Sequence, residues 1–249
     1  MSFDLLKVDK DVTNETKDTL PPKGSKFDPI ATGVYPMVIK LAYFTESRGG
    51  ATALNLVFKN ADGTGPEVKQ TMYVTSGTAK GKKNYYIDKK TGAKHTLPDM
   101  AKADGLHKLL ADAPLADVDV EKKIIKLWNF DEKGEVNTEV NMAMSLLDKS
   151  LLVGIVKKRQ NKRVQNDAGD WVDGPEPMEL NEIDKFFDTE GRTLTERDAG
   201  EDAVFIKDWK ERFPTTHVHD TFKELPGQAP AASKANGSAE PQKEVKSLF

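Results

Sequence analysis

Lysines and tyrosines concentrate in residues 69–94, KQTMYVTSGTAKGKKNYYIDKKTGAK, which hold seven lysines, three tyrosines and one aspartate. Lysine ammonium groups neutralise phosphates, and a tyrosine ring offers a face on which a base stacks, for about 1–3 kcal/mol per base. Alternation places Tyr73 on the lysine and threonine face of its strand, opposite Met72 and Val74. Tyr86 likewise falls on a polar face. This pattern suits a surface that stacks bases and holds a phosphate backbone.

The residues expected to contact a single-stranded nucleic acid therefore come first from this stretch. They are Tyr73, Tyr85, Tyr86, Lys69, Lys80, Lys82, Lys83 and Lys89. The alternative interpretation is structural, because tyrosines often lie half-buried on strands and lysines often occupy surface hairpins. The coincidence of both residue types favours binding.

A second basic cluster, KKRQNKR at residues 157–163, contains no acid and follows an apolar strand. It could extend the same groove through Lys157, Arg159 and Arg163, since arginine binds phosphate in a bidentate manner or stacks on a base. It could equally be a solvated hairpin end. Trp128 is ambiguous, and we interpret it as a core residue rather than a ligand contact.

The sequence offers no defensible catalytic or metal-binding motif. Residues 76–83, SGTAKGKK, fail as a phosphate-binding P-loop, because Ser76 stands at the first glycine position and Lys83 at the Ser/Thr position. His217 and His219 have the same-face spacing of a strand and could hold a metal. An exposed polar segment is the more common explanation of this spacing. Cysteine is absent, which excludes disulfides and thiol chemistry. We expect no enzymatic activity, no metal and no cofactor.

The net charge of −3 conceals a division along the chain. Residues 33–164 carry 22 Lys/Arg against 15 Asp/Glu, whereas acids exceed bases from residue 165 onward. This basic central region is expected to bind a polyanion. No apolar run approaches the roughly 20 residues that cross a bilayer, and the N-terminus does not resemble a signal peptide. We therefore expect a cytoplasmic protein with no membrane partner.

The residues named above are expected to lie on several short strands. One helix is inserted before the last group of strands. This order predicts a mainly β protein with inserted helices, most simply an OB-fold-like, partly open Greek-key β-barrel, although another barrel or sandwich stays open. Strands are expected at residues 35–43, 54–58, 69–75, 85–87, 121–130, 136–147 and 151–156, and the helix at 98–111.

Four regions follow from this pattern. Residues 1–32 are expected to form a flexible N-terminal arm, and residues 33–164 the nucleic-acid-binding barrel. Residues 165–224 form an acidic extension whose helix places Phe205, Ile206, Trp209 and Phe213 on one face. Residues 225–249 are expected to be a disordered tail of low complexity.

Three runs resemble the single-stranded DNA-binding proteins of podovirus-type bacteriophages: GVYPMVIKLAYFTESRGGATALNLVFKN, MYVTSGTAKGKKNYYIDKKTGAKHTLP and NEIDKFF. The resemblance is diffuse and covers residues 33 to about 213. It implies an OB-fold protein that coats and protects single-stranded DNA, with little sequence preference, during phage replication and recombination in an infected bacterium. Leu248 and Phe249 match the aromatic C-terminal tip with which such proteins capture replication partners. The tail departs from the pattern, since residues 225–249 hold three lysines against two glutamates, which puts tail-mediated autoinhibition in doubt.

Two other functions stay open. An adaptor could recruit a polymerase or a host transcription factor through residues 167–213 and the Leu248–Phe249 tip. A metal-dependent nuclease could use the acidic half together with His217 and His219, which we rank last because no spaced acid pair supports it.

Overall fold

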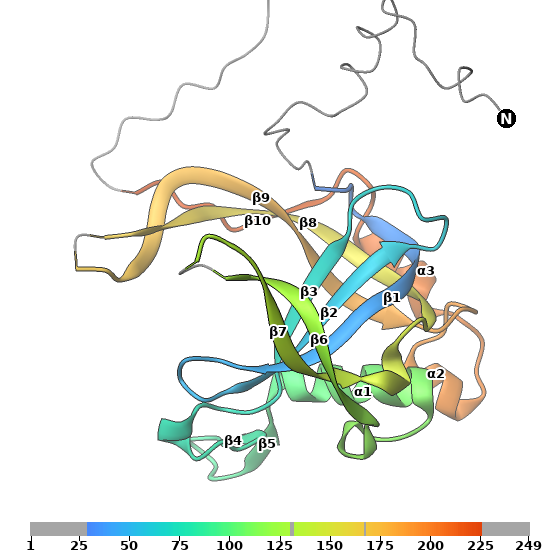
Figure 1. Ribbon diagram of the computed structural model, residues 1–249. Coiled ribbons are helices and arrows are strands. Elements are labelled where there is room, and N and C mark those ends of the chain that lie inside the picture. Colours follow the sequence, from blue (N-terminus) through green and yellow to red (C-terminus); the bar gives the residue numbers. More distant parts are fainter. Residues whose placement is uncertain (1–28, 130–131, 167, 226–249) are drawn as a thin grey trace, which may run out of the picture.

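The computed structural model describes residues 29–129, 132–166 and 168–225, and it is a mainly β protein with inserted helices, as the sequence predicts (Figure 1). Helices are few, and among the described residues none is long and apolar enough to cross a membrane. The strands are β1 (Gly33–Glu46), β2 (Thr52–Asn60), β3 (Val68–Tyr73), β4 (Tyr85–Ile87), β5 (Lys94–Thr96), β6 (Val120–Asn129), β7 (Gly134–Ala143), β8 (Ser150–Gln165), β9 (Trp171–Phe187) and β10 (Val218–Asp220). The helices are α1 (Pro98–Ala111), α2 (Leu194–Ala199) and α3 (Phe205–Arg212), with 3-10 turns at Thr78–Lys80, Leu115–Asp117 and Met144–Leu146.

Strand β1 organises the sheet, because it is long enough to take several partners. It pairs with β2 over Met37–Glu46, with β8 over Gly33–Val38 and with β7 at Tyr43–Phe44, all antiparallel. A register shift between Ile39 and Leu41 bends β1 between its β8 and β7 pairings. Strand β3 continues the sheet beyond β2, and the β6–β7 hairpin and the β8–β9 hairpin lie on the other side of β1.

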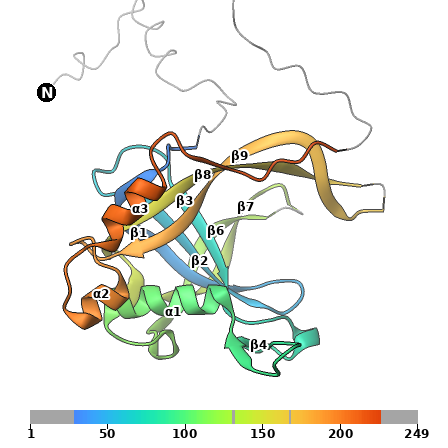
Figure 2. The same cartoon turned by 180° about the vertical axis from the view of Figure 1, so that it is seen from behind.

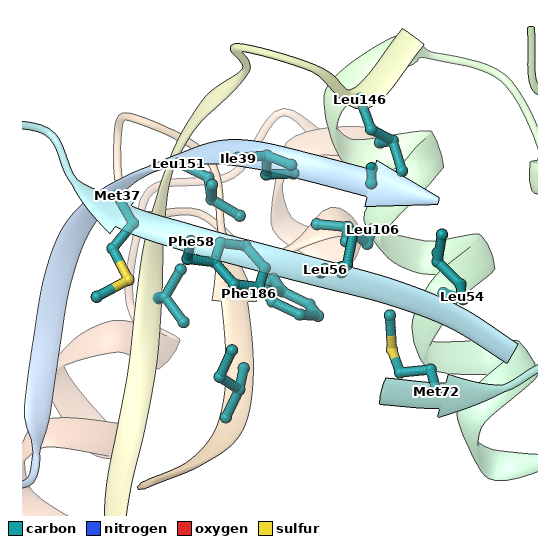
Figure 3. Packing of buried hydrophobic residues seen from close by; sticks show 14 of the residues in the cluster. Met37, Ile39, Leu54, Leu56, Phe58, Met72, Leu106, Leu146, Leu151 and Phe186 are labelled. Atoms are coloured by element: carbon teal, nitrogen blue, oxygen red, sulfur yellow. The ribbon is translucent and has the colours of Figure 1, made fainter. Parts of the chain in front are cut away.

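Alternating side chains fill the interior of this curved sheet. Met37, Leu54, Leu56, Phe58 and Met72 are at most 1% exposed, and Figure 3 shows them converging with residues of α1, β8 and β9. The Phe58 and Phe186 rings stack with centroids 5.9 Å apart. Helix α1 covers one end of this core through its leucines, in the position between β3 and the last strands that the sequence predicts (Figure 2).

A smaller second core fixes α3 against the back of β8 and β9. Trp209 is 3% exposed and packs with Val156, Phe187 and Ile206. The Trp209 indole N–H donates to Asp184 Oδ2 over 2.6 Å. The ring approaches β8 at Gly154, where a Cβ atom would lie only 3.0 Å from it. Glycine at this position is what allows the close packing.

Glu196 joins α2 to α3. It completes a capping box with Thr193 at the start of α2, while its Oε1 accepts from the backbone N–H groups of Val204 and Phe205 over 3.0 and 2.7 Å. Burial would raise the pKa of this carboxyl, but the hydrogen bonds from Phe205 and Thr193 outweigh it and the pKa is lowered. The charged form therefore holds the two helices together.

The expected boundary between barrel and acidic extension falls inside one hairpin. Strand β9, which the sequence did not predict, pairs with β8 from Phe187 to Trp171, so the acidic residues between 171 and 187 belong to the sheet. At the other end, Thr32 is 1% exposed, accepts from the Lys157 N–H and donates to the His217 carbonyl. Ordered packing thus begins before Gly33. Most of the expected arm, and the tail after residue 225, lie outside the described residues.

Candidate nucleic-acid interface

The outer face of β1–β2–β3 is polar and accessible along β3. Lys69, Thr71 and Tyr73 point outward, while Val68 and Met72 are buried, which is the alternation that the sequence predicts. Thr71 Oγ1 donates to Asn55 Oδ1 over 2.9 Å, and Asn55 Nδ2 donates to Thr45 Oγ1 over 2.8 Å. A hydrogen-bonded polar row therefore crosses the three strands and orients these side chains.

A lysine-rich lobe, defined as residues 74–97, is held at the end of this sheet (Figure 1). It docks on the β1–β2 turn, where the Thr78 N–H donates to the Gly49 carbonyl over 2.8 Å. Gly77 permits the approach, because a Cβ atom there would lie 2.5 Å from the Gly49 oxygen. Lys82 adds an ion pair of 2.9 Å with Glu46. The lobe is thus a fixed appendage of the β1–β2 turn.

Tyr73 and Lys80 share a depression of about 500 Å³ where β3, the lobe and α1 meet. Tyr73 is 48% exposed, and its backbone N–H donates to Asp99 Oδ2 over 2.9 Å, which fixes the end of β3 on α1. An accessible ring beside an ammonium group matches the needs of one stacked nucleotide. The depression is lined by Tyr73, Thr75, Ser76, Gly77, Ala79, Lys80, Leu97, Pro98 and Asp99.

The other two tyrosines lie on opposite faces of the β4–β5 hairpin. Tyr86 is 47% exposed and stacks on His95 with ring centroids 5.4 Å apart, which leaves its other face for a ligand. Tyr85 is half-buried, and the ammonium groups of Lys83 and Lys94 lie 5.6 and 5.0 Å from its ring centroid. Tyr85 therefore positions cations, whereas Tyr86 is the accessible ring.

Most cations of the lobe have no carboxylate partner. Within the described part of the chain, no Asp or Glu oxygen lies within 4.0 Å of the ammonium groups of Lys80, Lys83, Lys89, Lys90 or Lys94. Asp88, the acid among them, accepts from the backbone N–H groups of Thr91 and Lys90, which lower its pKa and tie it to its own turn. The lobe consequently carries a concentrated positive charge.

The second basic cluster differs, because the hairpin neutralises it. Lys157 pairs with Glu179 at 2.8 Å, Lys158 with Glu182 at 3.4 Å, and Lys162 with Glu176 at 3.0 Å, all across the β8–β9 ladder. Arg159 binds Asp220 of β10 at 2.9 Å and stacks on Phe222, and Arg163 donates to the Trp171 carbonyl. Lys157, Arg159 and Arg163, which the sequence suggested as nucleic-acid contacts, therefore bind other groups of the protein itself. Lys69 lies apart from both clusters, in a shallow hollow of β3 beside Asn181.

The assignment of Trp128 to the core is wrong. Its side chain is 58% exposed on the β6–β7 hairpin, which extends beyond the rest of the sheet (Figure 1). Trp171, which the sequence did not single out, is 60% exposed near the end of the β8–β9 hairpin. Alternation within a strand predicts which residues share a face. It does not show whether the face is covered.

The two histidines considered for a metal line one hollow together with Glu182 and Asp184. The His217 ring contacts Phe213 with centroids 5.1 Å apart, and His219 Nδ1 lies 3.5 Å from Glu182. Among the described residues, no group of three His, Asp or Glu side chains is placed to hold a metal ion. The Leu248–Phe249 tip lies outside the described residues.

The sequence matches no protein-family model and no curated protein.

Proposed function

We propose that the protein binds single-stranded DNA on the outer face of β3 and on the lysine-rich lobe. The observation that carries this proposal is the cluster of lysines that have no carboxylate partner among the described residues, around the exposed rings of Tyr73 and Tyr86. Phosphates would meet Lys80, Lys83, Lys89 and their neighbours, while unpaired bases stack on the two rings. Because stacking needs an unpaired base face, the site favours a single strand over a duplex.

The proposed role is to coat and protect displaced strands during phage DNA replication and recombination, in the cytoplasm of an infected bacterium. This part of the proposal is supported by the sequence resemblance of residues 33–213. The proposed action on the strand is binding alone.

Binding to a labelled single-stranded oligonucleotide and to its matching duplex, at 50 and 200 mM salt as chosen assay conditions, tests the proposal. We expect preference for the single strand and a log–log salt slope of about −3.5 if all five unpaired lysines of the lobe meet a phosphate, at about −0.7 per contact. Equal affinity for both forms, or a slope near zero, would contradict the proposal. Cleavage of the oligonucleotide with added magnesium would favour the nuclease alternative.

Stacking on Tyr73 is tested separately with two variants. Tyr73→Ala should weaken single-strand binding by about 5- to 160-fold, the equivalent of about 1–3 kcal/mol per stacked base. Tyr73→Phe should bind nearly as well as the wild type, since the phenylalanine ring keeps the stacking face. Fluorescence anisotropy at fixed salt measures both. If the phenylalanine variant binds as weakly as the alanine variant, the hydroxyl group rather than the ring makes the contact.

A further inference from the structure

One face of β6 alternates cationic and apolar side chains and is uncovered. Lys122, Ile124, Lys126 and Trp128 follow each other at every second position, so they share this face. Ile124 is 71% exposed and Trp128 is 58% exposed. An uncovered isoleucine and tryptophan on one strand are costly to leave in water, which indicates a surface that meets a ligand.

The charges around Trp128 are compatible with a phosphate backbone. Within the described residues, Lys126 and Lys133 have no carboxylate within 4.0 Å, while Lys122 pairs with Glu139 at 2.8 Å. Glu135 stands opposite Trp128 on β7 and is the nearest acid in the pairing register. Cations and acids are therefore balanced around the ring, and Lys126 and Lys133 are the cations that no carboxylate within the described residues neutralises by an ion pair.

Trp171 provides an internal comparison in the same molecule. Its ring is 60% exposed, but Asp170 precedes it and Asp173 follows two residues later. Neither carboxylate has a cation within 4.0 Å among the described residues. The nearby cation, Arg163, is engaged with the Trp171 carbonyl, so the acids on either side of this ring disfavour a phosphate backbone. Both hairpins extend to the same side of the molecule, the side on which the lobe also lies (Figure 1, Figure 2).

We propose that the exposed face of β6 is a second contact site for the same DNA strand, with Trp128 stacking on a base and Lys126 meeting a phosphate, and that Trp171 takes no part. This inference rests on the proposed function. It places the strand on the β6–β7 hairpin as well as on the lobe, so that the hairpin forms part of the binding path.

Tryptophan fluorescence tests it directly, because the protein has three tryptophans and Trp209 is buried. Adding oligo(dT) should quench the emission of the wild type and of the variant Trp171→Phe to a similar extent. The variant Trp128→Phe should lose most of the quenching. In binding assays, Trp128→Ala should lose about 5- to 160-fold in affinity, whereas Trp171→Ala should change it by less than about twofold, as expected for a residue outside the binding path. An unchanged far-UV circular dichroism spectrum confirms the fold of each variant.

The outcomes separate this inference from the proposed function. If the wild type binds the oligonucleotide but Trp128 is neither quenched nor needed, the β6 site is excluded and the lobe site stands. Equal quenching of Trp128 and Trp171 would contradict the charge argument that distinguishes them. Absence of any binding by the wild type would overturn both proposals together.

Discussion

Replacing Lys80, Lys83 and Lys89 together by alanine should weaken single-strand binding by about 100-fold at 50 mM salt and reduce the salt slope by about 2, at about 0.7 per lost phosphate contact. These ammonium groups have no carboxylate within 4.0 Å in the described part of the chain, so each is available to displace a counterion from the strand. Titrations at several salt concentrations measure both quantities. A weaker affinity with an unchanged slope would mean that the lysines act through the lobe's fold rather than through phosphates.

The matched control is a triple alanine variant of Lys157, Lys158 and Lys162. Each of these lysines already pairs with a glutamate of β9, so removing them should change affinity by less than about threefold at the same 50 mM salt. Both variants remove the same formal charge. A comparable loss of affinity in the two would show that overall charge, rather than the lobe, determines binding.

The sequence predicted most of the strands because their side chains alternate. Positions 35–43, 54–58 and 69–75 show an apolar face with period two, and the structure has strands there. Strand β9 was not predicted, because several glutamates and Pro177 interrupt that period. Its acids are compatible with a strand because β8 supplies cations that pair with them diagonally across the ladder, at Lys157, Lys158 and Lys162.

The same pairing explains why the two basic clusters looked alike in sequence and differ in the structure. No acid lies within residues 157–163, and the acids that neutralise them stand 13 or more positions later in the chain. Only the register of the β8–β9 hairpin brings them together. By contrast, the lobe is a local excursion between β3 and α1, so its lysine content could be predicted from the segment itself.

Truncating Trp209 to alanine should cost about 3–5 kcal/mol of unfolding free energy, the usual range for removing a buried aromatic side chain. The ring is 3% exposed, fills the space above Gly154 and donates to Asp184, so the variant loses packing and leaves that carboxylate without its indole partner. For a domain of this size the midpoint of thermal unfolding should fall by about 6–20 °C, at about 2–4 °C per kcal/mol. Urea unfolding followed by circular dichroism gives the free energy directly.

Trp171→Ala removes the same residue type from a site that is 60% exposed, and it should change stability by less than about 0.5 kcal/mol. Trp209→Phe should fall between the two, because it keeps an apolar ring but loses the N–H donor to Asp184. The second core lies on the back of β8 and β9, away from the lobe, so folded Trp209→Ala should bind the single strand as the wild type does. A small stability loss in Trp209→Ala would show that α3 is not needed to hold β8 and β9, whereas weakened binding by the folded variant would show that the two surfaces are coupled through the sheet.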